Sequence, residues 1–300
     1  MRSNLIRNIS GDRKLNLFQY IYWMFIAYLN IKFDRFKIYK RLQVINYKPK
    51  KTYSSLKKKK PSPSRYLCDL FWKELPYRFI FPYGFRAVEV GCGTGVYGNF
   101  LKKNKNFKTY TGIDIKNNWK FNDKKLNFIQ DSFKNIDNYF YKINFLFTQS
   151  ALEHFDEDLD FHFKISKQIK KNYKKKKFFQ LHFVPSENCL FTYLAHGYRH
   201  FTINSISKIC EFYDKNETEF IVFKLGSINS LKLHLRYITL PKFYSKFTSR
   251  YEVADYKVKL DDAILKDSND SENDDSSFYA IMILSNYKKS EVKRILDHYR

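Results

Sequence analysis

The sequence predicts an α/β fold in which a mostly parallel, doubly wound sheet of seven strands carries helices on both faces. Two observations lead to this prediction. Short strand-like runs alternate with segments long enough for helices through most of the chain. A glycine-rich stretch, VEVGCGTGVYGNF at 88–100, continues directly from the first of these runs. With 300 residues, 44% of them apolar, the chain can bury a substantial core.

Each element is expected from its local pattern. A first helix is expected at 66–75, where apolar residues recur at helical spacing after the sequence SPSR, and a later helix around 205–213. The strands are expected at 86–90, 110–113, 127–130, 144–147, 178–183, 219–225 and 278–285. In such a sheet, ligands bind beyond the carboxyl ends of the strands.

Composition divides the chain into parts. Residues 48–65, KPKKTYSSLKKKKPSPSR, have the Lys, Pro and Ser content of a linker. This linker separates a basic, aromatic N-terminal helical arm at 1–47 from the main domain at 66–300. Residues at about 226–277 lie between the last two strands and are expected to form an insertion before the last strand. The acidic stretch at 261–275 is expected to give that insertion a partly disordered tip.

The net charge of +25 is concentrated near the N-terminus, since residues 1–65 contain seventeen Lys or Arg and only two acids, Asp12 and Asp34. Within the arm, the apolar run Tyr20–Leu29 is too short to span a bilayer, and it lacks the features of a signal peptide. One helical face carries Phe18, Ile21, Tyr22, Phe25, Tyr28 and Leu29.

Two interpretations of this arm remain open. The helix could pack on the main domain, or it could lie on an anionic membrane as a peripheral contact through residues 13–41, with its aromatic face at the interface and its basic residues near the lipid headgroups. The four cysteines are far apart and form no C-x-x-C pair, which argues against a disulfide framework and a structural zinc site. These features favour a cytoplasmic location, with possible contact at the inner face of the cell membrane.

The glycine-rich stretch excludes two common phosphate-binding motifs. A dinucleotide fold would place a third glycine where the chain has Val96, and a P-loop would need a Lys after Gly95 or Gly98. What remains, E-x-G-x-G-x-G after the first strand, resembles the cofactor loop of class I S-adenosylmethionine (SAM)-dependent methyltransferases, which have a Rossmann-like fold. Side-chain-free backbone lets a ligand lie directly against the turn.

This resemblance implies a set of residues that bind SAM. It implies that Glu89 orients the methionyl ammonium, that Asp114 at the end of TGID accepts the ribose hydroxyls, and that Asp131 with Ser132 reads the adenine amino group. The complete cofactor set that it implies is Glu89, Gly91, Cys92, Gly93, Gly95, Asp114, Ile115, Asp131, Ser132, Gln149 and Ser150.

A narrower resemblance concerns the acceptor. The stretches SPSRYLCDLFWKELP, TQSALEHF, LHFVPS, AHGYRHFT and SFYAIMILSN look like those of uncharacterised methyltransferases encoded among polysaccharide and lipopolysaccharide biosynthesis genes. This resemblance implies O-methylation of a sugar or glycan. An RNA methyltransferase that uses the basic arm, and a methyltransferase-like scaffold without turnover, are the alternatives.

Histidines supply the candidate bases and acceptor contacts. His182 near the end of the fifth strand and His154 after the fourth are expected to border the cleft, where an imidazole could take a proton; a structural role is the alternative for each. His196, Arg199 and His200 are candidate acceptor-binding residues; for Arg199, a salt bridge between this loop and a helix is the alternative. Some related enzymes bind a divalent ion through Glu-x-x-Glu-His, but Ser150 replaces the first Glu here, so no metal is expected.

Overall fold

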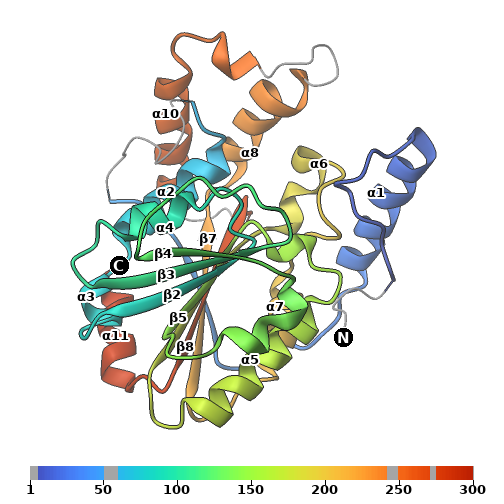
Figure 1. Ribbon diagram of the computed structural model, residues 1–300. Helices are drawn as coiled ribbons and strands as arrows, with labels where there is room; N and C mark the ends of the chain where they lie inside the picture. Colours follow the sequence, from blue (N-terminus) through green and yellow to red (C-terminus); the bar gives the residue numbers. More distant parts are fainter. Residues whose placement is uncertain (1–5, 51–59, 242–248, 271–274, 300) are drawn as a thin grey trace.

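The computed structural model describes residues 6–50, 60–241, 249–270 and 275–299. Within these ranges eight strands form one sheet in the order β1-β7-β8-β6-β5-β2-β3-β4 (Figure 1). β8 runs antiparallel to its neighbours β6 and β7, and the other pairs are parallel. The strands are β1 (Leu42–Asn46), β2 (Phe85–Val90), β3 (Phe107–Asp114), β4 (Leu126–Gln130), β5 (Phe145–Gln149), β6 (Phe178–Pro185), β7 (Thr218–Leu225) and β8 (Phe278–Ser285).

The predicted α/β class is confirmed, but the sheet has one strand more than the seven expected. The additional strand, β1, comes from the N-terminal arm and pairs in parallel with β7, with Val44 opposite Val222. None of its residues LQVIN is buried, so this strand contributes no apolar run to the core by which its sequence could be recognised. Pairing with β7, whose edge would otherwise be open, makes this segment a strand.

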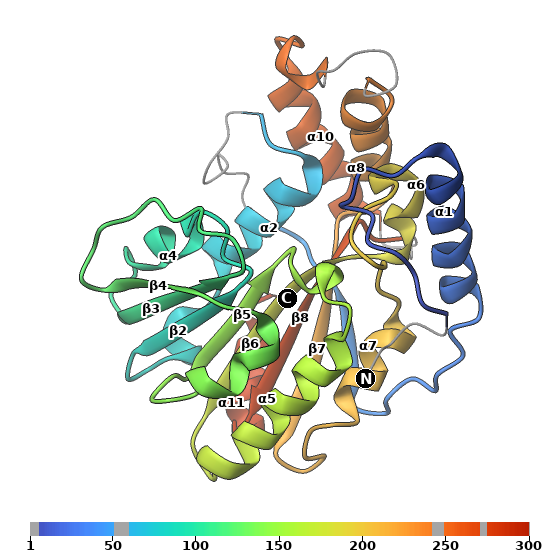
Figure 2. The ribbon, with the colours of Figure 1, turned by 45° about the vertical axis from the view of Figure 1, so that its right-hand side comes forward.

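Helices cover both faces of the sheet (Figure 2). On one face, α2 (Pro63–Glu74), α3 (Tyr77–Ile80), α4 (Val96–Leu101) and α11 (Lys289–Asp297) contribute to an aromatic-rich core with Phe145, Phe179 and Phe223. On the other face, η1 (Phe133–Tyr139), α5 (Asp158–Asn172) and α7 (Ile203–Cys210) cover a second core. The short helices η2 (Leu152–His154), η3 (Glu187–Cys189) and α6 (Leu190–Tyr193) follow β5 and β6. Both cores pack directly against the sheet. This packing fixes the positions of the strand ends.

The first helix of the main domain begins earlier than its apolar pattern indicates. α2 starts at Pro63, after Ser62 accepts a hydrogen bond from the N–H of Arg65 as the N-cap. It buries Leu67, Leu70 and Phe71 against the sheet. Half of the expected linker, residues 51–59, lies outside the described residues, while 63–65 belong to this helix.

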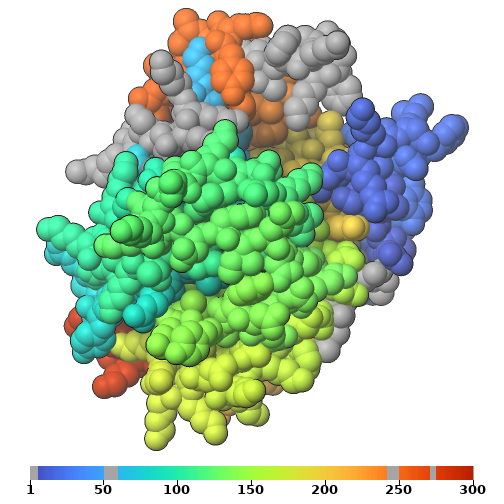
Figure 3. Space-filling view, viewed as in Figure 1, coloured from blue at the N-terminus to red at the C-terminus, as the bar shows by residue number. Residues whose placement is uncertain are grey.

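The N-terminal helix α1 (Leu17–Lys32) packs on the main domain through a face different from the one its sequence pattern indicated. Asn16 and Gln19 form a capping box at its start. Trp23, Ile26 and Ala27 are its buried apolar residues. Five residues of the expected apolar face are instead exposed, namely Phe18, Ile21, Tyr22, Phe25 and Tyr28. In Figure 3 the N-terminal segment, in blue, forms a projecting flank of the molecule.

The insertion between β7 and β8 is largely helical where it is described. It contains α8 (Ile228–His234), the π-helix η4 (Leu235–Thr239), η5 (Ser249–Tyr251) and α10 (Tyr256–Asn269). The first nine residues of the acidic stretch lie in α10, and 271–274 lie outside the described residues. Asp267 on α10 accepts hydrogen bonds from the N–H groups of Ser227, Asn229 and Ser230, which ties α10 to the start of α8. Among the described helices, none combines the length and hydropathy needed to cross a membrane.

Candidate active site

The glycine-rich loop forms a tight turn between β2 and α4. Gly91, Gly93 and Gly95 all have positive φ angles, 78°, 53° and 73°, which L-residues other than glycine adopt with strain. A Cβ on Gly95 would lie 2.3 Å from the ring of Trp119, so this position also needs glycine for space. A Cβ on Gly93 would meet no atom within 4 Å. The turn is therefore covered on one side and open at Gly93.

Asp114, the last residue of β3, is held against this loop. One of its carboxylate oxygens accepts the N–H of Gly93 at 2.8 Å, and the other accepts the N–H of Lys116 at 2.9 Å. Each oxygen has a second lone pair, so the carboxylate can still accept hydroxyl groups of a ligand. The next residue, Ile115, is 65% exposed and offers an apolar surface beside the loop.

A pocket of about 250 Å³ opens between the glycine loop and helix α2. Glu89 lies at its buried end, 1% exposed, and accepts the hydroxyl of Tyr110 at 2.5 Å. Burial raises the pKa of Glu89 to about 8, although the Tyr110 hydrogen bond and the charge of Arg65 oppose this shift. The pocket is lined by Arg65, Asp69, Glu89, Gly91, Cys92, Gly93, Thr94, Val96, Tyr97 and Gln149.

Two charged residues of α2 line this pocket although the sequence did not single them out. Arg65 donates to the hydroxyl of Tyr97 at 2.5 Å, and that hydroxyl donates to Asp69 at 3.0 Å. Burial acts to lower the pKa of Arg65, but Tyr97, Cys68 and Asp69 outweigh it and raise the pKa. Arg65 and Asp69 are four residues apart and therefore lie on the same face of α2. This spacing is the only local feature of the sequence that links them.

The predicted cofactor residues after β4 and β5 lie in two places. Gln149 lines the pocket, accepts the indole N–H of Trp72 at 2.8 Å, and donates to Ser150 at 3.4 Å. Asp131 and Ser132 do not line this pocket; they follow β4, where the N–H of Asp131 bonds to the carbonyl of Asp114. Hydrogen bonds from Tyr139, Asn135 and the Ser132 N–H lower the pKa of Asp131.

The structure does not bring His182 to the cleft. Its side chain is fully buried in the core, with Nδ1 3.0 Å from the hydroxyl of Thr148 and the ring edge-on to His162. Burial lowers the pKa of His182 to about 3, so the ring is neutral at physiological pH. The sequence of β6 could not reveal that His182 points into the core. Every residue of this strand is buried, so no alternation of polar and apolar residues distinguishes its two faces.

Two of the three candidate acceptor residues in the 195–202 loop are also buried. Arg199 pairs with Asp158 and stacks on the ring of Phe201 at 3.7 Å, so its guanidinium holds the loop and does not face an acceptor. His200 is 3% exposed and lies edge-on to Trp23. Burial lowers the pKa of His200 to about 3. Of the three, only His196 is substantially accessible.

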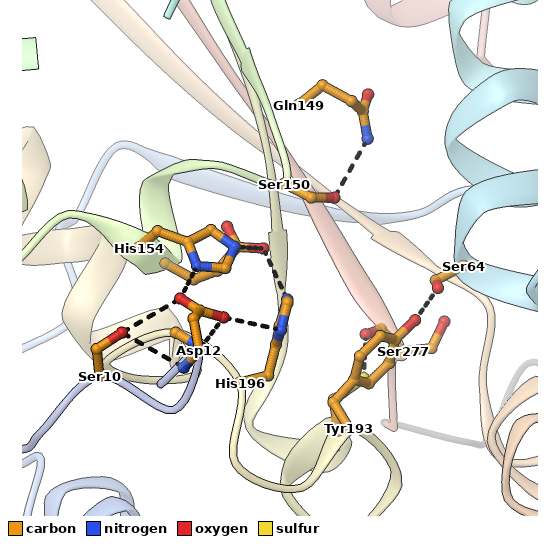
Figure 4. A network of polar contacts seen from close by, with 12 residues as sticks. Ser10, Asp12, Ser64, Gln149, Ser150, His154, Tyr193, His196 and Ser277 are labelled. Atoms are coloured by element: carbon orange, nitrogen blue, oxygen red, sulfur yellow. Dashed lines mark hydrogen bonds and ion pairs between the residues drawn. The ribbon is translucent and has the colours of Figure 1, made fainter. Parts of the chain in front are cut away.

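His196 and His154 lie together in a cluster that also contains Asp12 of the arm (Figure 4). Asp12 lies 2.5 Å from Nδ1 of His154 and 3.5 Å from Nδ1 of His196. Burial acts to raise the pKa of Asp12, but His154, His196 and the N–H of Gly197 outweigh it and lower the pKa to about 2. For His154, burial acts to lower the pKa, and Asp12 and Glu153 outweigh it and raise the pKa.

Close backbone approach brings the arm to this cluster. The N–H of Gly11 donates to the carbonyl of Gly197 at 2.6 Å, and the indole N–H of Trp23 donates to the same carbonyl at 3.0 Å. A Cβ on Gly11 would lie 2.5 Å from the backbone of Ala195, and one on Gly197 would lie 2.6 Å from the carbonyl oxygen of Glu153. Sequence reasoning missed Asp12 because 142 residues separate it from His154.

A larger hollow of about 950 Å³ lies at the opposite ends of the strands. It is open and basic, with Arg86, Lys108, Lys142, Lys176 and Lys177 among its lining residues. It contains neither the glycine loop nor the strand-end carboxylates. The smaller pocket is therefore the candidate active site.

No protein-family model matches the chain, and no curated protein is found to be similar in sequence. Solved structures with a similar fold include the plantazolicin methyltransferase BamL in complex with a triazolic desmethylPZN analog and SAH, at 17% identity and a TM-score of 0.47, covering 75% of this chain and 85% of that one. A SAM dependent methyltransferase from Archaeoglobus fulgidus has 15% identity and a TM-score of 0.41, covering 71% and 93%. The methyltransferase domain of bacterial CtHen1 has 14% identity and a TM-score of 0.40, covering 68% and 91%. Similarities at these identities and TM-scores concern the fold alone.

Proposed function

We propose that this chain is a SAM-dependent methyltransferase and that the pocket beside the glycine loop binds SAM. The observation that carries this proposal is the arrangement of charges around the pocket. Glu89 and Asp69 provide carboxylates for an ammonium group, and Arg65 provides a cation for a carboxylate. The methionyl part of SAM has both groups.

The rest of the cofactor would lie along the neighbouring strand ends. The ribose hydroxyls would meet Asp114, which the glycine loop already orients, and the open side of Gly93 would admit the ligand against bare backbone. The adenine would extend over the exposed side chain of Ile115 toward Asp131 and Ser132. Cys92, Gln149 and Ser150 complete the wall, as the resemblance implies.

Binding of SAM and of its demethylated product SAH to the full-length protein tests this proposal by calorimetry. Asp114→Ala removes the ribose acceptor and is expected to weaken binding of both ligands by roughly tenfold to a hundredfold, the cost of leaving buried hydroxyl groups without an acceptor. Asp123→Ala is the matched control, because Asp123 pairs with Lys102 and does not line the pocket. Unfolding curves of each variant check that the fold is retained. Failure of the wild-type protein to bind either ligand would refute the cofactor assignment.

The proposed reaction is O-methylation of a hydroxyl on a sugar or glycan. The acceptor oxygen forms a bond to the methyl carbon as the carbon–sulfur bond breaks, and the electron pair of that bond converts the sulfonium into a neutral thioether. The hydroxyl proton passes to a ring nitrogen of His154 or His196, which follow β5 and β6, and Asp12 of the arm lies against both histidines. Alignment of the two reactants supplies much of the acceleration.

The sugar acceptor rests on the resemblance of several stretches to enzymes from polysaccharide biosynthesis genes, and labelled methyl transfer tests it. Transfer of a labelled methyl group from SAM into cell-envelope glycan extracts is the expected result. Retention of SAM binding without transfer into glycan, RNA or peptide fractions would favour a scaffold without turnover. Transfer into RNA alone would favour the other enzyme class.

We also propose that α1 contacts an anionic membrane, which would bring the site close to a lipid-linked acceptor. The exposed face of α1 carries Phe18, Ile21, Tyr22, Phe25 and Tyr28, which are all at least 43% exposed. Basic residues precede, end and follow this helix in the sequence, at Arg13, Lys14, Lys32, Arg35, Lys37, Lys40 and Arg41. An aromatic face bordered by cations is the composition of a helix that lies in the headgroup region.

A further inference from the structure

The cluster beside the pocket contains a fourth polar group whose environment is unusual. Glu153 is fully buried, and neither of its carboxylate oxygens has a hydrogen-bond partner within the described part of the chain. One of these oxygens lies 3.8 Å from Nε2 of His154 and 3.8 Å from Nε2 of His196. An ionised carboxylate buried without hydrogen bonds costs several kcal/mol. Glu153 faces the Nε2 side of both histidines, whereas Asp12 faces their Nδ1 side.

The other three groups have the spacing of metal ligands. One ligand atom from each of Asp12, His154 and His196 lies within 4.8 Å of the others. A four-coordinate ion with bonds of about 2.0–2.2 Å separates its ligand atoms by about 3.4 Å. The distance from Nδ1 of His196 to Asp12, 3.5 Å, is close to that separation. Glu153 lies on the Nε2 side of both rings, where its carboxylate can accept their Nε2–H groups once Nδ1 binds an ion. The shorter distance of 2.5 Å between Asp12 and His154 is that of a hydrogen bond, which would open as an ion enters.

We propose that Asp12 and the Nδ1 atoms of His154 and His196 bind one divalent transition-metal ion, with Glu153 accepting the Nε2–H groups of both histidines. Two imidazole nitrogens and one carboxylate form a donor set suited to Zn²⁺, Mn²⁺ or Fe²⁺, whereas Mg²⁺ and Ca²⁺ prefer oxygen ligands alone. The charges of Asp12 and Glu153 together balance the charge of one divalent ion.

Backbone hydrogen bonds and close contacts hold together the segments that carry these four residues. Glu153 and His154 lie in η2, directly after β5, while the carbonyl of Glu153 accepts the N–H of Tyr198 at 2.8 Å. Gly197 lets the loop with His196 pass against Glu153, and the bond between Gly11 and Gly197 places Asp12 beside both. Figure 4 shows His154, His196 and Asp12 directed toward one another, and in the same view Ser150 accepts a hydrogen bond from Gln149, which lines the pocket.

The ion would have two consequences. It would crosslink the arm to the main domain, because Asp12 is a ligand from the arm. If the proposed function holds, the ion would replace the free imidazoles as the group that favours loss of the hydroxyl proton, which would then pass to water. The first consequence does not depend on methyl transfer.

Mn²⁺ binding to the full-length protein, after treatment with a chelator and its removal, tests the proposal. Loss of the electron paramagnetic resonance signal of free Mn²⁺ is expected to saturate at one ion per chain, and pulsed spectra of the bound ion are expected to show coupling to imidazole nitrogen. The midpoint of thermal unfolding is expected to rise with Mn²⁺ concentration, since an ion that binds only the folded state stabilises it. No SAM is present, so failure here is distinct from failure of the cofactor proposal.

Variants of the proposed residues test which of them hold the ion. Asp12→Asn, Glu153→Gln and His196→Gln are each expected to weaken Mn²⁺ binding by at least tenfold and to abolish the thermal shift. Asp156→Asn is the matched control, because Asp156 is close in the chain but pairs with Lys134, and its binding should equal that of the wild type. Absence of saturable binding, absence of nitrogen coupling, or equal binding by all variants would overturn the proposal. The spectra of the wild-type protein decide the matter even where a variant does not fold.

Discussion

Glu89 is an acid in surroundings that disfavour its charge. It lies at the buried end of the pocket, and burial raises its pKa from 4.5 to about 8, against the opposing effect of the Tyr110 hydrogen bond. A raised pKa in the folded state means that folding favours the protonated form. Its contribution to stability is therefore fully present below about pH 4.5 and is lost as pH rises through 8. An arriving ammonium group would favour the ionised form instead.

Glu89→Gln is expected to remove this pH dependence while keeping an acceptor for Tyr110. Between pH 5 and 8, the free energy of unfolding of the wild type should fall relative to that of the variant by up to about 1.4 kcal/mol per pH unit. Denaturant unfolding at several pH values measures the difference, and Glu211→Gln, an exposed acid, serves as the control. Parallel stability profiles for wild type and Glu89→Gln would show that the carboxyl is not perturbed by burial.

Histidine illustrates how environment decides a residue's role. His182 and His200 are buried among apolar and aromatic side chains, and burial lowers the pKa of each to about 3. The carboxylates around His154 outweigh burial and raise its pKa. The same side chain is therefore a neutral core residue at two positions and a member of a polar cluster at a third.

At the scale of elements, Trp23 is the largest side chain that α1 buries against the domain. Trp23 is fully buried, packs with Ala27 and Leu190, and donates to the carbonyl of Gly197. The remaining apolar residues of the helix mostly face outward. The position of Asp12, and with it the polar cluster, therefore depends on how α1 docks.

Trp23→Ala is expected to cost about 3–5 kcal/mol of docking free energy, because it removes a large buried side chain and leaves the Gly197 carbonyl without its indole donor. Hydrogen exchange measures the effect: the Gly11 amide, which donates to Gly197, should lose its protection. Phe25→Ala, at a position 57% exposed, should change little, within about 0.5 kcal/mol. Unaltered protection of Gly11 in Trp23→Ala would contradict this account of docking.

At the scale of the whole molecule, the pocket, the polar cluster and the arm lie toward one edge of the sheet, where the parallel strands end. The insertion with α8 and α10 stands above α2 at the same edge (Figure 1). The buried face of α1 lies against α6 and the 195–202 loop, so a membrane bound by the opposite face of α1 would lie on the side of the molecule that carries the polar cluster.

Flotation of the full-length protein with vesicles that contain an anionic lipid tests this proposal. Replacing Phe18 and Phe25 with Ser is expected to reduce the bound fraction about tenfold or more, since each buried Phe contributes roughly 1.5–3 kcal/mol, and added salt should weaken wild-type binding. Because β1 belongs to the sheet, point variants are preferable to deletion of the arm.

The matched control replaces Val258 and Leu265 with Ser, since these apolar residues of α10 are similarly exposed. This variant should float like the wild type. Equal flotation of the Phe18 and Phe25 variant would exclude α1 as the contact.

Local patterns in the sequence identified the seven strands of the main domain and the glycine loop, and they placed Glu89 and Asp114 at strand ends. This succeeded because buried strands are continuous apolar runs and because a turn with positive φ angles requires glycine, so neighbouring residues carry the information. The same reasoning placed His182 and Arg199 in the cleft, where the structure does not bring them. Periodicity tells which residues are buried together but not whether a polar residue among them faces a ligand or a core partner.

Three features arise from contacts between distant segments and have no local signature. β1 becomes a strand because β7 offers an edge, Arg65 and Asp69 face the pocket because α2 packs across it, and Asp12 meets His154 because Gly11 and Gly197 allow two backbones to touch. Each depends on the approach of chain segments that lie far apart in sequence. Such approaches follow from packing of the complete chain, which no single stretch of residues encodes.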